Sequence, residues 1–277
     1  MSQTDELDLV LNLEAIELDM FRGHTPPDRL RRIYGGQVVG QALTAAYRTI
    51  EGRVCNSLHA YFIRPGDPKV PILFKVERAR DGGSFSIRRV IAIQHGQQIF
   101  NLAASFQVPE EGFEHQIAMP DAPGPDGLLN EAQLREQAGA PPPSDGVWPI
   151  EVRPVNPRPF GSLEPAEPVY IVWFRATTPF RNDPAAHQSV LAYASDMTLM
   201  DAALRPHPVD WESGRLQGAS LDHAVWFHRP SDLSQWHLYV QESPSASGAR
   251  GFNRASIFSQ DGVLVASATQ EALMRWR

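Results

Sequence analysis

An acidic residue stands inside an apolar, small-residue stretch of this chain. The stretch reads VLAYASDMTLM and contains Asp196. An aspartate is costly to bury unless it is paired or takes part in chemistry. A buried carboxylate of this kind can accept a proton from water or hold a water molecule in orientation. In the alternative interpretation, Asp196 lies on a solvated helix face or is satisfied by backbone groups.

Ser220, Asp222 and His223 have the residue types of a hydrolytic triad. They lie on one expected strand, GASLDHAVWFH, where successive side chains point to opposite faces. Asp222 and His223 would diverge there and could not form the oriented pair that a triad needs. We interpret His223 and His228 as structural histidines, and expect no histidine closer than His228 on the face of Ser220. A hydrolase with these residues must activate water directly.

Other catalytic signatures do not occur in the sequence. It has no G-x-S-x-G elbow, no G-x-x-x-x-G-K loop and no G-x-G-x-x-G fingerprint. The glycine-rich YGGQVVGQ has the wrong spacing for a dinucleotide site, and we interpret it as a place of close helix packing. No H-E-x-x-H motif occurs, and the single cysteine, Cys55, excludes internal disulfides and multi-cysteine metal sites. We expect no metal and no cofactor.

Composition limits the class of protein. The 277 residues suffice for one large domain or two small ones, and 42% hydrophobic with 21% charged residues is ordinary for a globular protein. A net charge of -7 argues against a nucleic-acid partner, which requires a basic face. The acidic start resembles neither a signal nor a transit peptide, and no segment is long and apolar enough to span a membrane. We expect a cytoplasmic protein without a membrane partner.

The chain repeats itself at one constant spacing. Residues 57–65 read SLHAYFIRP, and residues 222–230 read DHAVWFHRP, with Phe, Arg and Pro at matching places. Further identities follow without a gap: Asp67 and Asp232, Leu73 and Leu238, Glu77 and Glu242, Gly83 and Gly248, Arg89 and Arg254, Ala103 and Ala268. Self-similarity of this kind indicates a duplicated unit.

The predicted elements support the duplication. Each half begins with a helix of small residues, GGQVVGQALTAAYRTI or SVLAYASDMTLMDAAL, whose small side chains allow close packing on a sheet. Alternating strands follow: HAYFI, PILFKVERA, FSIRRVIAIQ and QIFNLAASFQV, then HAVWFH, WHLYVQES, FNRASIFSQ and VLVASATQEALM. The turn signals QHGQ and SQDGV stand at corresponding places.

A proline-rich connector separates the halves. Residues 120–168 hold half of the chain's 24 prolines, a density that opposes regular structure. Within this segment we expect one short helix, GLLNEAQLREQ. We therefore predict an α+β protein with an N-terminal unit over 1–119, a connector over 120–168, and a C-terminal unit over 169–277 that carries the active site.

Several long motifs resemble the acyl-CoA thioesterase II family. They are YGGQVVGQAL, SLHAYFIRPGDP, SLDHAVWFHRP and SASGARGFNRASIFSQDGVLVASATQEALMR. The resemblance runs from about residue 5 to the C-terminus and is weakest in the connector. It implies a double hotdog fold, in which two tandem units each wrap an antiparallel sheet around a long helix. It also implies hydrolysis of fatty acyl-CoA, medium- to long-chain with broad specificity, to a free fatty acid and coenzyme A.

The resemblance further implies three catalytic residues. They are Asp196 in the second-half helix, Ser220 on the following strand and Gln270 near the C-terminus. Relatives often have Thr where Ser220 stands, so we expect retained function with a slightly looser site. Laying the first-half helix over the second puts Gly36 or Gln37 opposite Asp196, and the constant spacing puts Ser105 opposite Gln270. The first half then has no equivalent carboxylate, and we expect one active site per chain.

Other readings and partners complete the expectations. A hydratase of the same fold would need His five residues after Asp196, where Asp201 stands. A non-catalytic, regulatory acyl-CoA-binding protein is the other alternative. The resemblance implies a homo-oligomer, dimer or tetramer, acting in fatty acid metabolism. The candidates for contact with the nucleotide of acyl-CoA are basic residues, which are Arg29, Arg31, Arg32, Arg64, Arg229 and Arg250.

Overall fold

The computed structural model describes residues 4–26, 32–141, 148–211 and 214–277. The N-terminal half contains helices α1 (Thr4–Leu11) and α2 (Gly35–Tyr47), and strands β1 (Glu14–Glu17), β2 (Met20–Gly23), β3 (Val54–Phe62), β4 (Ile72–Asp81), β5 (Phe85–Gln94) and β6 (Gln97–Gln107). The remainder contains helices α3 (Glu131–Gln137), α4 (Pro184–Ala194) and α5 (Asp201–Leu204), and strands β7 (Ile150–Pro154), β8 (Val169–Ala176), β9 (Leu216–Ser220), β10 (Asp222–Phe227), β11 (His237–Ser247), β12 (Arg250–Ser259) and β13 (Leu264–Trp276).

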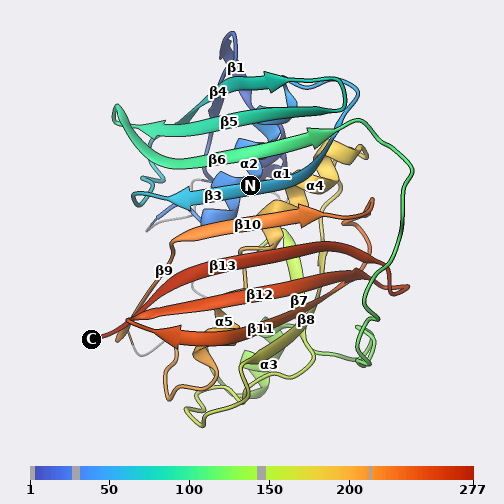
Figure 1. Cartoon of the computed structure of the whole chain (residues 1–277). Coiled ribbons are helices and arrows are strands. Elements are labelled where there is room, and N and C mark those ends of the chain that lie inside the picture. The colour runs from blue at the N-terminus through green and yellow to red at the C-terminus, as the bar shows by residue number, and fades with distance from the viewer. Residues whose placement is uncertain (1–3, 27–31, 142–147, 212–213) are drawn as a thin grey trace.

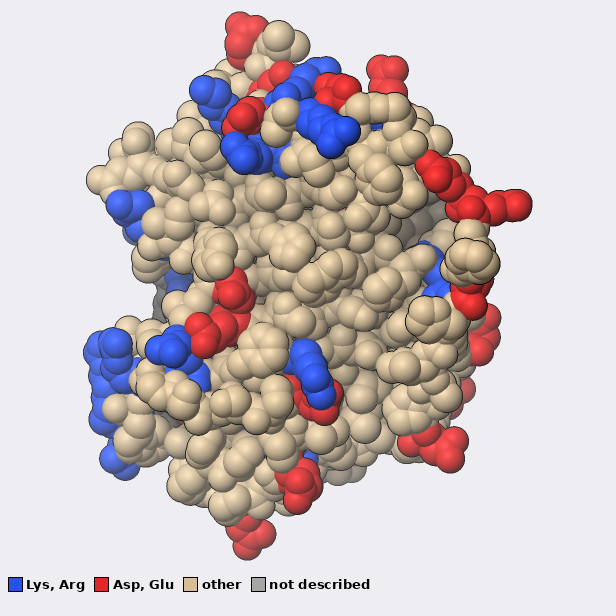
Figure 2. Space-filling view, viewed as in Figure 1, with Lys and Arg blue, Asp and Glu red and all other residues tan. Residues whose placement is uncertain are grey.

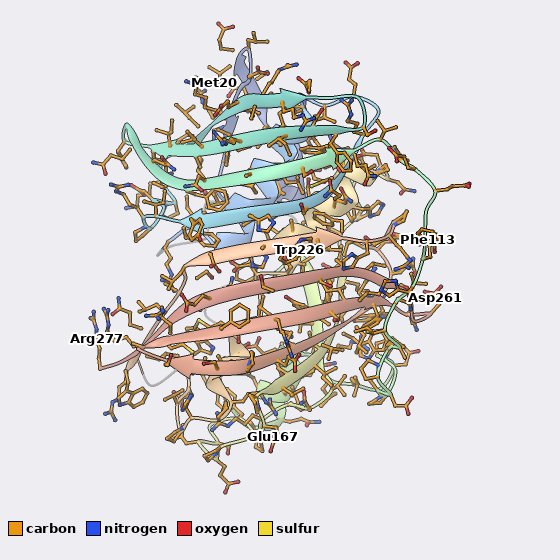
Figure 3. All side chains as sticks on the ribbon, in the orientation of Figure 1. Met20, Phe113, Glu167, Trp226, Asp261 and Arg277 are labelled. Carbon is orange, nitrogen blue, oxygen red and sulfur yellow. The ribbon has the colours of Figure 1, made fainter. Side chains whose placement is uncertain are left out.

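The strands in the described residues form one 13-stranded antiparallel sheet, with the helices on one face (Figure 1). Its order is β1-β2-β4-β5-β6-β3 followed by β10-β13-β12-β11-β8-β7, while β9 extends the line of β10 along β13. Each strand of the first series has a counterpart in the second, read outward from the central pair β3 and β10. Trp226, which is labelled in Figure 3, lies at this seam. Its ring packs edge-on against the ring of His59. The symmetry confirms the α+β class and the duplicated unit.

The duplication is visible in individual side-chain pairs. Glu77 pairs with Arg89 across β4 and β5, and Glu242 pairs with Arg254 across β11 and β12. Both pairs are ion pairs, with N–O distances of 3.8 and 2.6 Å. The predicted turns also form: His95 and Gly96 have positive φ between β5 and β6, and Gly262 does so between β12 and β13. The two units therefore share register as well as topology.

The two edges of the sheet differ from the sequence-based expectations. Strand β7 lies inside the expected connector, because the prolines there flank the strand or stand at its last position. Strands β7 and β8 are the counterparts of β1 and β2 at the sheet edges, and none of the four was predicted. The short helix expected in the connector forms as α3, capped by Asn130 and Gln133. The described part of the chain contains no helix long and apolar enough to cross a membrane.

The expected helix over SVLAYASDMTLMDAAL breaks in the middle. Helix α4 ends at Ala194, and α5 begins only at Asp201, so Asp196 lies in the turn between them. Side chains replace the helical partners at this end: the Ser195 hydroxyl donates to the Ala192 carbonyl, and the Tyr239 hydroxyl donates to the Ser195 carbonyl. Such bonds satisfy the last carbonyl groups without another helical turn. Asp196 therefore lies outside both helices.

Helices α2 and α4 pack against each other in antiparallel fashion between the two units. A Cβ atom added at Gly36 would overlap the Tyr193 carbonyl oxygen, and one at Gly40 would lie 3.0 Å from the Ser189 carbonyl oxygen. The small residues of YGGQVVGQ thus allow α2 to approach α4, and the helix pair fills the core under the sheet. The N-terminus of α2 comes to lie beside the C-terminal end of α4.

This contact predicts the effect of a side chain at Gly36. Alanine normally stabilises a helix interior relative to glycine, but Gly36→Ala must push α2 away from Tyr193. We expect it to lower the free energy of unfolding by about 1–3 kcal/mol, the usual cost of overpacking. Urea denaturation measures the loss. Gly83→Ala is the control, because its Cβ would meet nothing within 4 Å. Equal stabilities of the two variants would contradict the close helix packing.

Candidate active site

Asp196 meets the beginning of helix α2 from the opposite unit. Its side chain is buried, with 9% of the residue surface exposed. The Gly36 backbone N–H donates to the carboxylate, and a Cβ at Gly35 would lie 2.6 Å from Oδ2. The α2 N-cap residue, Tyr34, makes no side-chain capping bond within the described residues, so the carboxylate caps this helix. The positive end of the helix dipole favours a negative group there.

Two further side chains converge on the same carboxylate oxygen. Ser220, the last residue of β9, donates from its hydroxyl to Asp196 Oδ1 at 3.0 Å. Gln270, in the middle of β13, donates from Nε2 to the same oxygen. The structure therefore brings together the three residues that the family resemblance indicated, from a turn and two adjacent strands.

The environment of Asp196 raises the pKa of its carboxyl group toward neutral pH. Burial raises its pKa to about 6, while hydrogen bonds from Gln270, Ser220 and Gly36 and the charge of Arg32 act in the opposite direction. A carboxylate with this pKa is ionised at neutral pH and is a stronger proton acceptor than an exposed aspartate. The arrangement suits general-base chemistry.

The structure separates Asp222 from His223, as strand alternation predicts. Asp222 Oδ1 accepts from the Glu271 backbone N–H, whereas the His223 ring is fully buried. His223 Nε2 lies 2.8 Å from Ser195 Oγ, and Nδ1 lies 3.3 Å from Gln270 Nε2. No Ser–His–Asp triad forms from these residues.

The expectation that His223 lies on the face opposite Ser220 is wrong. Ser220 pairs with Ala272 on β13, but Ala224 pairs with Thr269, so β9 and β10 hold one residue more than their partner between these positions. Such a bulge reverses the alternation of side chains. It brings the His223 ring to the amide of Gln270, a contact that strict parity could not predict. Ser220 itself still bonds Asp196 and not His223.

The first unit has a different set of residues at the equivalent place. Asn253, the fourth residue of β12, pairs with Gln270, and Arg88, the fourth residue of β5, pairs with Ala104. Ala104, not Ser105, is therefore the counterpart of Gln270. The constant spacing failed because the turn before β13 is longer: Ile93 pairs with Gln98, but Phe258 pairs with Leu264.

The counterpart of Asp196 also differs from the expectation. Asp196 stands two residues beyond α4, and Thr49 stands two residues beyond α2, so neither Gly36 nor Gln37 is equivalent to it. The buried Arg88 guanidinium binds the Thr49 hydroxyl at 2.8 Å and Asp81 at 2.7 Å. Cys55, which pairs with Phe106 as Ser220 pairs with Ala272, stands where the hydroxyl would be. The first unit holds a buried cation where the second holds a carboxylate.

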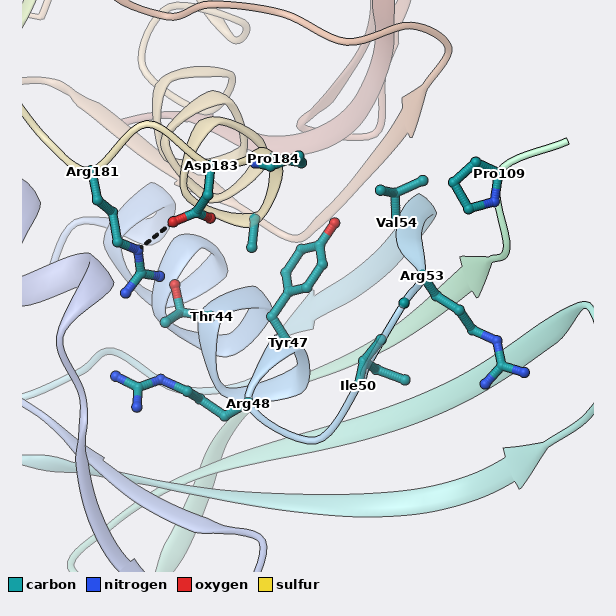
Figure 4. Close-up of a pocket in the computed structure, with 12 residues that line it drawn as sticks. Thr44, Tyr47, Arg48, Ile50, Arg53, Val54, Pro109, Arg181, Asp183 and Pro184 are labelled. Atoms are coloured by element: carbon teal, nitrogen blue, oxygen red, sulfur yellow. Dashed lines mark ion pairs between the residues drawn. The ribbon is translucent and has the colours of Figure 1, made fainter.

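A hollow of about 660 Å³ opens at the opposite end of the helix pair (Figure 4). Thr44, Tyr47 and Arg48 line it from the end of α2, and Arg181 and Asp183 line it from the segment before α4. Arg181 and Asp183 form an ion pair at 3.0 Å, and both are substantially exposed. This hollow lacks the buried carboxylate of the Asp196 site, and we do not assign the chemistry to it.

The basic candidates for nucleotide contact lie in several places. Arg32 donates to the Gly218 carbonyl at 3.2 Å, and its charge acts on Asp196. Arg64 and Arg229 bind backbone carbonyl groups, and Arg250 pairs with Glu271. Arg29 and Arg31 lie outside the described residues. Within the described ranges, no group of three or more His, Cys, Asp or Glu residues is placed to hold a metal ion.

Comparisons with known proteins identify relatives along nearly the whole chain. The family model described as acyl-CoA thioesterase matches residues 144–273, and that described as acyl-CoA thioesterase N-terminal domain matches residues 25–107. Human acyl-coenzyme A thioesterase 8 is 41% identical over 96% of this chain and 88% of its own length. Acyl-CoA thioesterase 2 of Haemophilus influenzae is 41% identical over 96% of both chains.

Solved structures agree with the sequence relatives. An acyl-CoA thioesterase II from Mycobacterium marinum superimposes with a TM-score of 0.79 at 41% identity, covering 98% of each chain. A hot dog fold protein from Alicyclobacillus acidocaldarius has a TM-score of 0.81 at 20% identity over 98% of each chain, which supports the fold alone. The expected double hotdog fold is confirmed. Two family models in tandem and relatives of 41% identity along both units show that the chain belongs to the acyl-CoA thioesterase family.

Proposed function

We propose that this protein hydrolyses acyl-CoA thioesters by direct attack of a water molecule that Asp196 activates. The observation that carries the proposal is the buried Asp196 carboxylate, which accepts bonds from Ser220, Gln270 and the start of α2 and has a pKa of about 6. The chain's membership of the acyl-CoA thioesterase family supports the substrate class. No feature of the described site favours a non-catalytic acyl-CoA-binding role.

The proposed reaction uses one proton acceptor. Asp196 takes a proton from water as the water oxygen attacks the thioester carbonyl, and the carbon–sulfur bond then breaks. The proton passes from Asp196 to the departing thiolate, so that a fatty acid and coenzyme A are the products. Backbone N–H groups at the start of α2 stabilise the negative charge on the carbonyl oxygen. Ser220 and Gln270 hold the carboxylate in place for these transfers.

We also propose the finer properties that the family resemblance implies. They are a broad preference for medium- to long-chain fatty acyl groups, a cytoplasmic location, a role in fatty acid metabolism, and assembly into a homo-oligomer. The outer face of the sheet supports the last of these. Figure 2 shows few Lys, Arg, Asp or Glu residues over the middle of this face, and Tyr61 and Ile63 near the seam are exposed. A broad uncharged surface favours contact with another protein surface.

Removing the proposed base tests the function directly. The wild-type protein should release free thiol from acyl-CoA, with a rate that varies with acyl chain length. Asp196→Asn should fold and lower kcat roughly 10²–10⁴-fold, the contribution of a positioned general base. Asp201→Asn is the matched control. The Asp201 carboxyl group is also partly buried, but it accepts a hydrogen bond from Trp211, which lies outside the proposed site. Equal losses in the two variants, or no thiol release by the wild type, would contradict the proposal.

The pKa of Asp196 predicts the dependence of activity on pH. Burial raises this pKa to about 6, and only the ionised carboxylate accepts a proton. We expect kcat/KM to be level above that pH and to fall about tenfold per unit below it. Asp201 also has its pKa raised to about 6 by burial, so the profile of Asp201→Asn must be measured too. If Asp201→Asn loses the decline in activity at low pH, the titrating group is Asp201 and not Asp196, which would contradict this prediction.

Ser220 variants separate water attack from covalent catalysis. The Ser220–Asp196 hydrogen bond also has the geometry of a nucleophile beside its base. If Ser220 only orients groups, Ser220→Thr should keep or improve kcat, since Thr presents its hydroxyl with fewer rotamers. Ser220→Ala should weaken activity without abolishing it and move the acid limb to higher pH, because a bond that lowers the Asp196 pKa is lost. Rapid-quench experiments should find no acyl group on the protein, and a trapped acyl-Ser220 would overturn the mechanism.

A further inference from the structure

The amide of Gln270 lies between two hydrogen-bond acceptors. Its Nε2 donates to Asp196 Oδ1 on one side and lies 3.3 Å from His223 Nδ1 on the other. Gln270 is 1% exposed and His223 is 0% exposed, so bulk water does not compete for these hydrogen bonds. An amide nitrogen has two hydrogens and can serve both acceptors.

These contacts fix the direction of every bond in the chain of groups. A carboxylate oxygen only accepts, so the Gln270 nitrogen faces Asp196 and its second hydrogen reaches His223 Nδ1. His223 Nδ1 must then be unprotonated, and Nε2 carries the ring proton. That proton points to Ser195 Oγ at 2.8 Å, and the Ser195 hydroxyl donates to the Ala192 carbonyl at 3.1 Å. The series ends on a backbone group at the end of α4.

The charge state of His223 agrees with this arrangement. Burial lowers the pKa of His223 to about 4, so the ring is neutral at neutral pH. A neutral ring has one donor nitrogen and one acceptor nitrogen, as the bonds to Ser195 and Gln270 require. A doubly protonated ring would present a donor to the Gln270 amide nitrogen.

We propose that His223 and Ser195 are positioning residues that hold the Gln270 amide with its nitrogen toward Asp196. This inference rests on the proposed function. The two ends of a glutamine amide have similar size, so shape alone does not select one orientation. The reversed amide would place Oε1 against the Asp196 carboxylate and leave the nitrogen without an acceptor there. The Nε2–H tautomer of His223, fixed by Ser195, makes the productive orientation the only one that satisfies both neighbours.

The first unit has a different residue at the position equivalent to His223. Leu58 pairs with Ala104 across β3 and β6, at the place where His223 lies beside Gln270. Leu58 is fully buried and packs in the core. The histidine and the glutamine are thus present together in the unit with the carboxylate and replaced together in the other. The comparison also supplies a test variant, because leucine already fits the equivalent strand position.

A double-mutant cycle tests whether His223 acts through Gln270. The variants are His223→Leu, Gln270→Ala and the double variant, assayed for kcat and KM by thiol release from one acyl-CoA. We expect His223→Leu to lower kcat about tenfold with little change in KM, a coupling usual for contacting residues. In the Gln270→Ala background the same change should alter kcat less than about twofold. Losses that multiply in the double variant, or an unchanged kcat in His223→Leu, would overturn the proposal.

A second measurement keeps the test independent of folding and of catalysis. Nitrogen NMR of the wild-type histidines, with His223 assigned through scalar couplings to its own backbone, reports which ring nitrogen carries the proton. We expect Nε2–H, and detection of Nδ1–H would overturn the proposal even if the enzyme were active. If His223→Leu does not fold, Ser195→Ala takes its place in the cycle, with a smaller loss of kcat that again vanishes without Gln270. If the wild type releases no thiol, the proposed function fails, while the tautomer still tests the arrangement.

Discussion

The close antiparallel approach of α2 to α4 determines where the buried charge of this protein can lie. Contact between Gly36 and the Tyr193 carbonyl brings the start of α2 to the turn that follows α4. Asp196 then receives a backbone N–H from one unit and two side-chain donors from the other. A buried carboxylate without such donors would be strongly destabilising. The site is therefore a property of the packed pair of units, and neither unit contains all of its parts.

The raised pKa of Asp196 shows that this compensation is incomplete. A shift from 3.8 to about 6 means that the ionised group costs the folded state about 3 kcal/mol above the folded pKa. The sign follows from linkage: below the unfolded pKa both states are protonated and the cost disappears. A second such carboxylate in the first unit would add a similar cost. That unit instead buries Arg88 beside Thr49 and Asp81. Of the two duplicated units, only the second therefore has a buried carboxylate at this place.

The sequence predicts those parts of the fold that depend on local patterns. Alternating residues define β3 to β6 and β10 to β13, and the turn residues define the two hairpins. The end of α4 at Ala194 is not visible in the same way, because it depends on a distant hydroxyl, that of Tyr239. The burial cost marks Asp196 as unusual, but Ser220 and Gln270 were recognisable only by family resemblance. His223 was missed because the bulge after Ser220 reverses the side-chain alternation.

The hydrogen bonds of the site also distinguish the two oxygens of Asp196. Ser220 and Gln270 both donate to Oδ1, and a proton on that oxygen would oppose two existing donors. In the proposed reaction Oδ2 is therefore the oxygen that accepts the proton from water. Oδ2 faces Gly35, where any Cβ atom would lie 2.6 Å away. A side chain at Gly35 would overlap this oxygen, so the glycine allows Oδ2 to face the start of α2. In the proposed reaction, the N–H groups of that same helix turn stabilise the charge that develops on the thioester oxygen. The proposed reaction thus assigns both the proton acceptor and the developing oxyanion to one helix terminus.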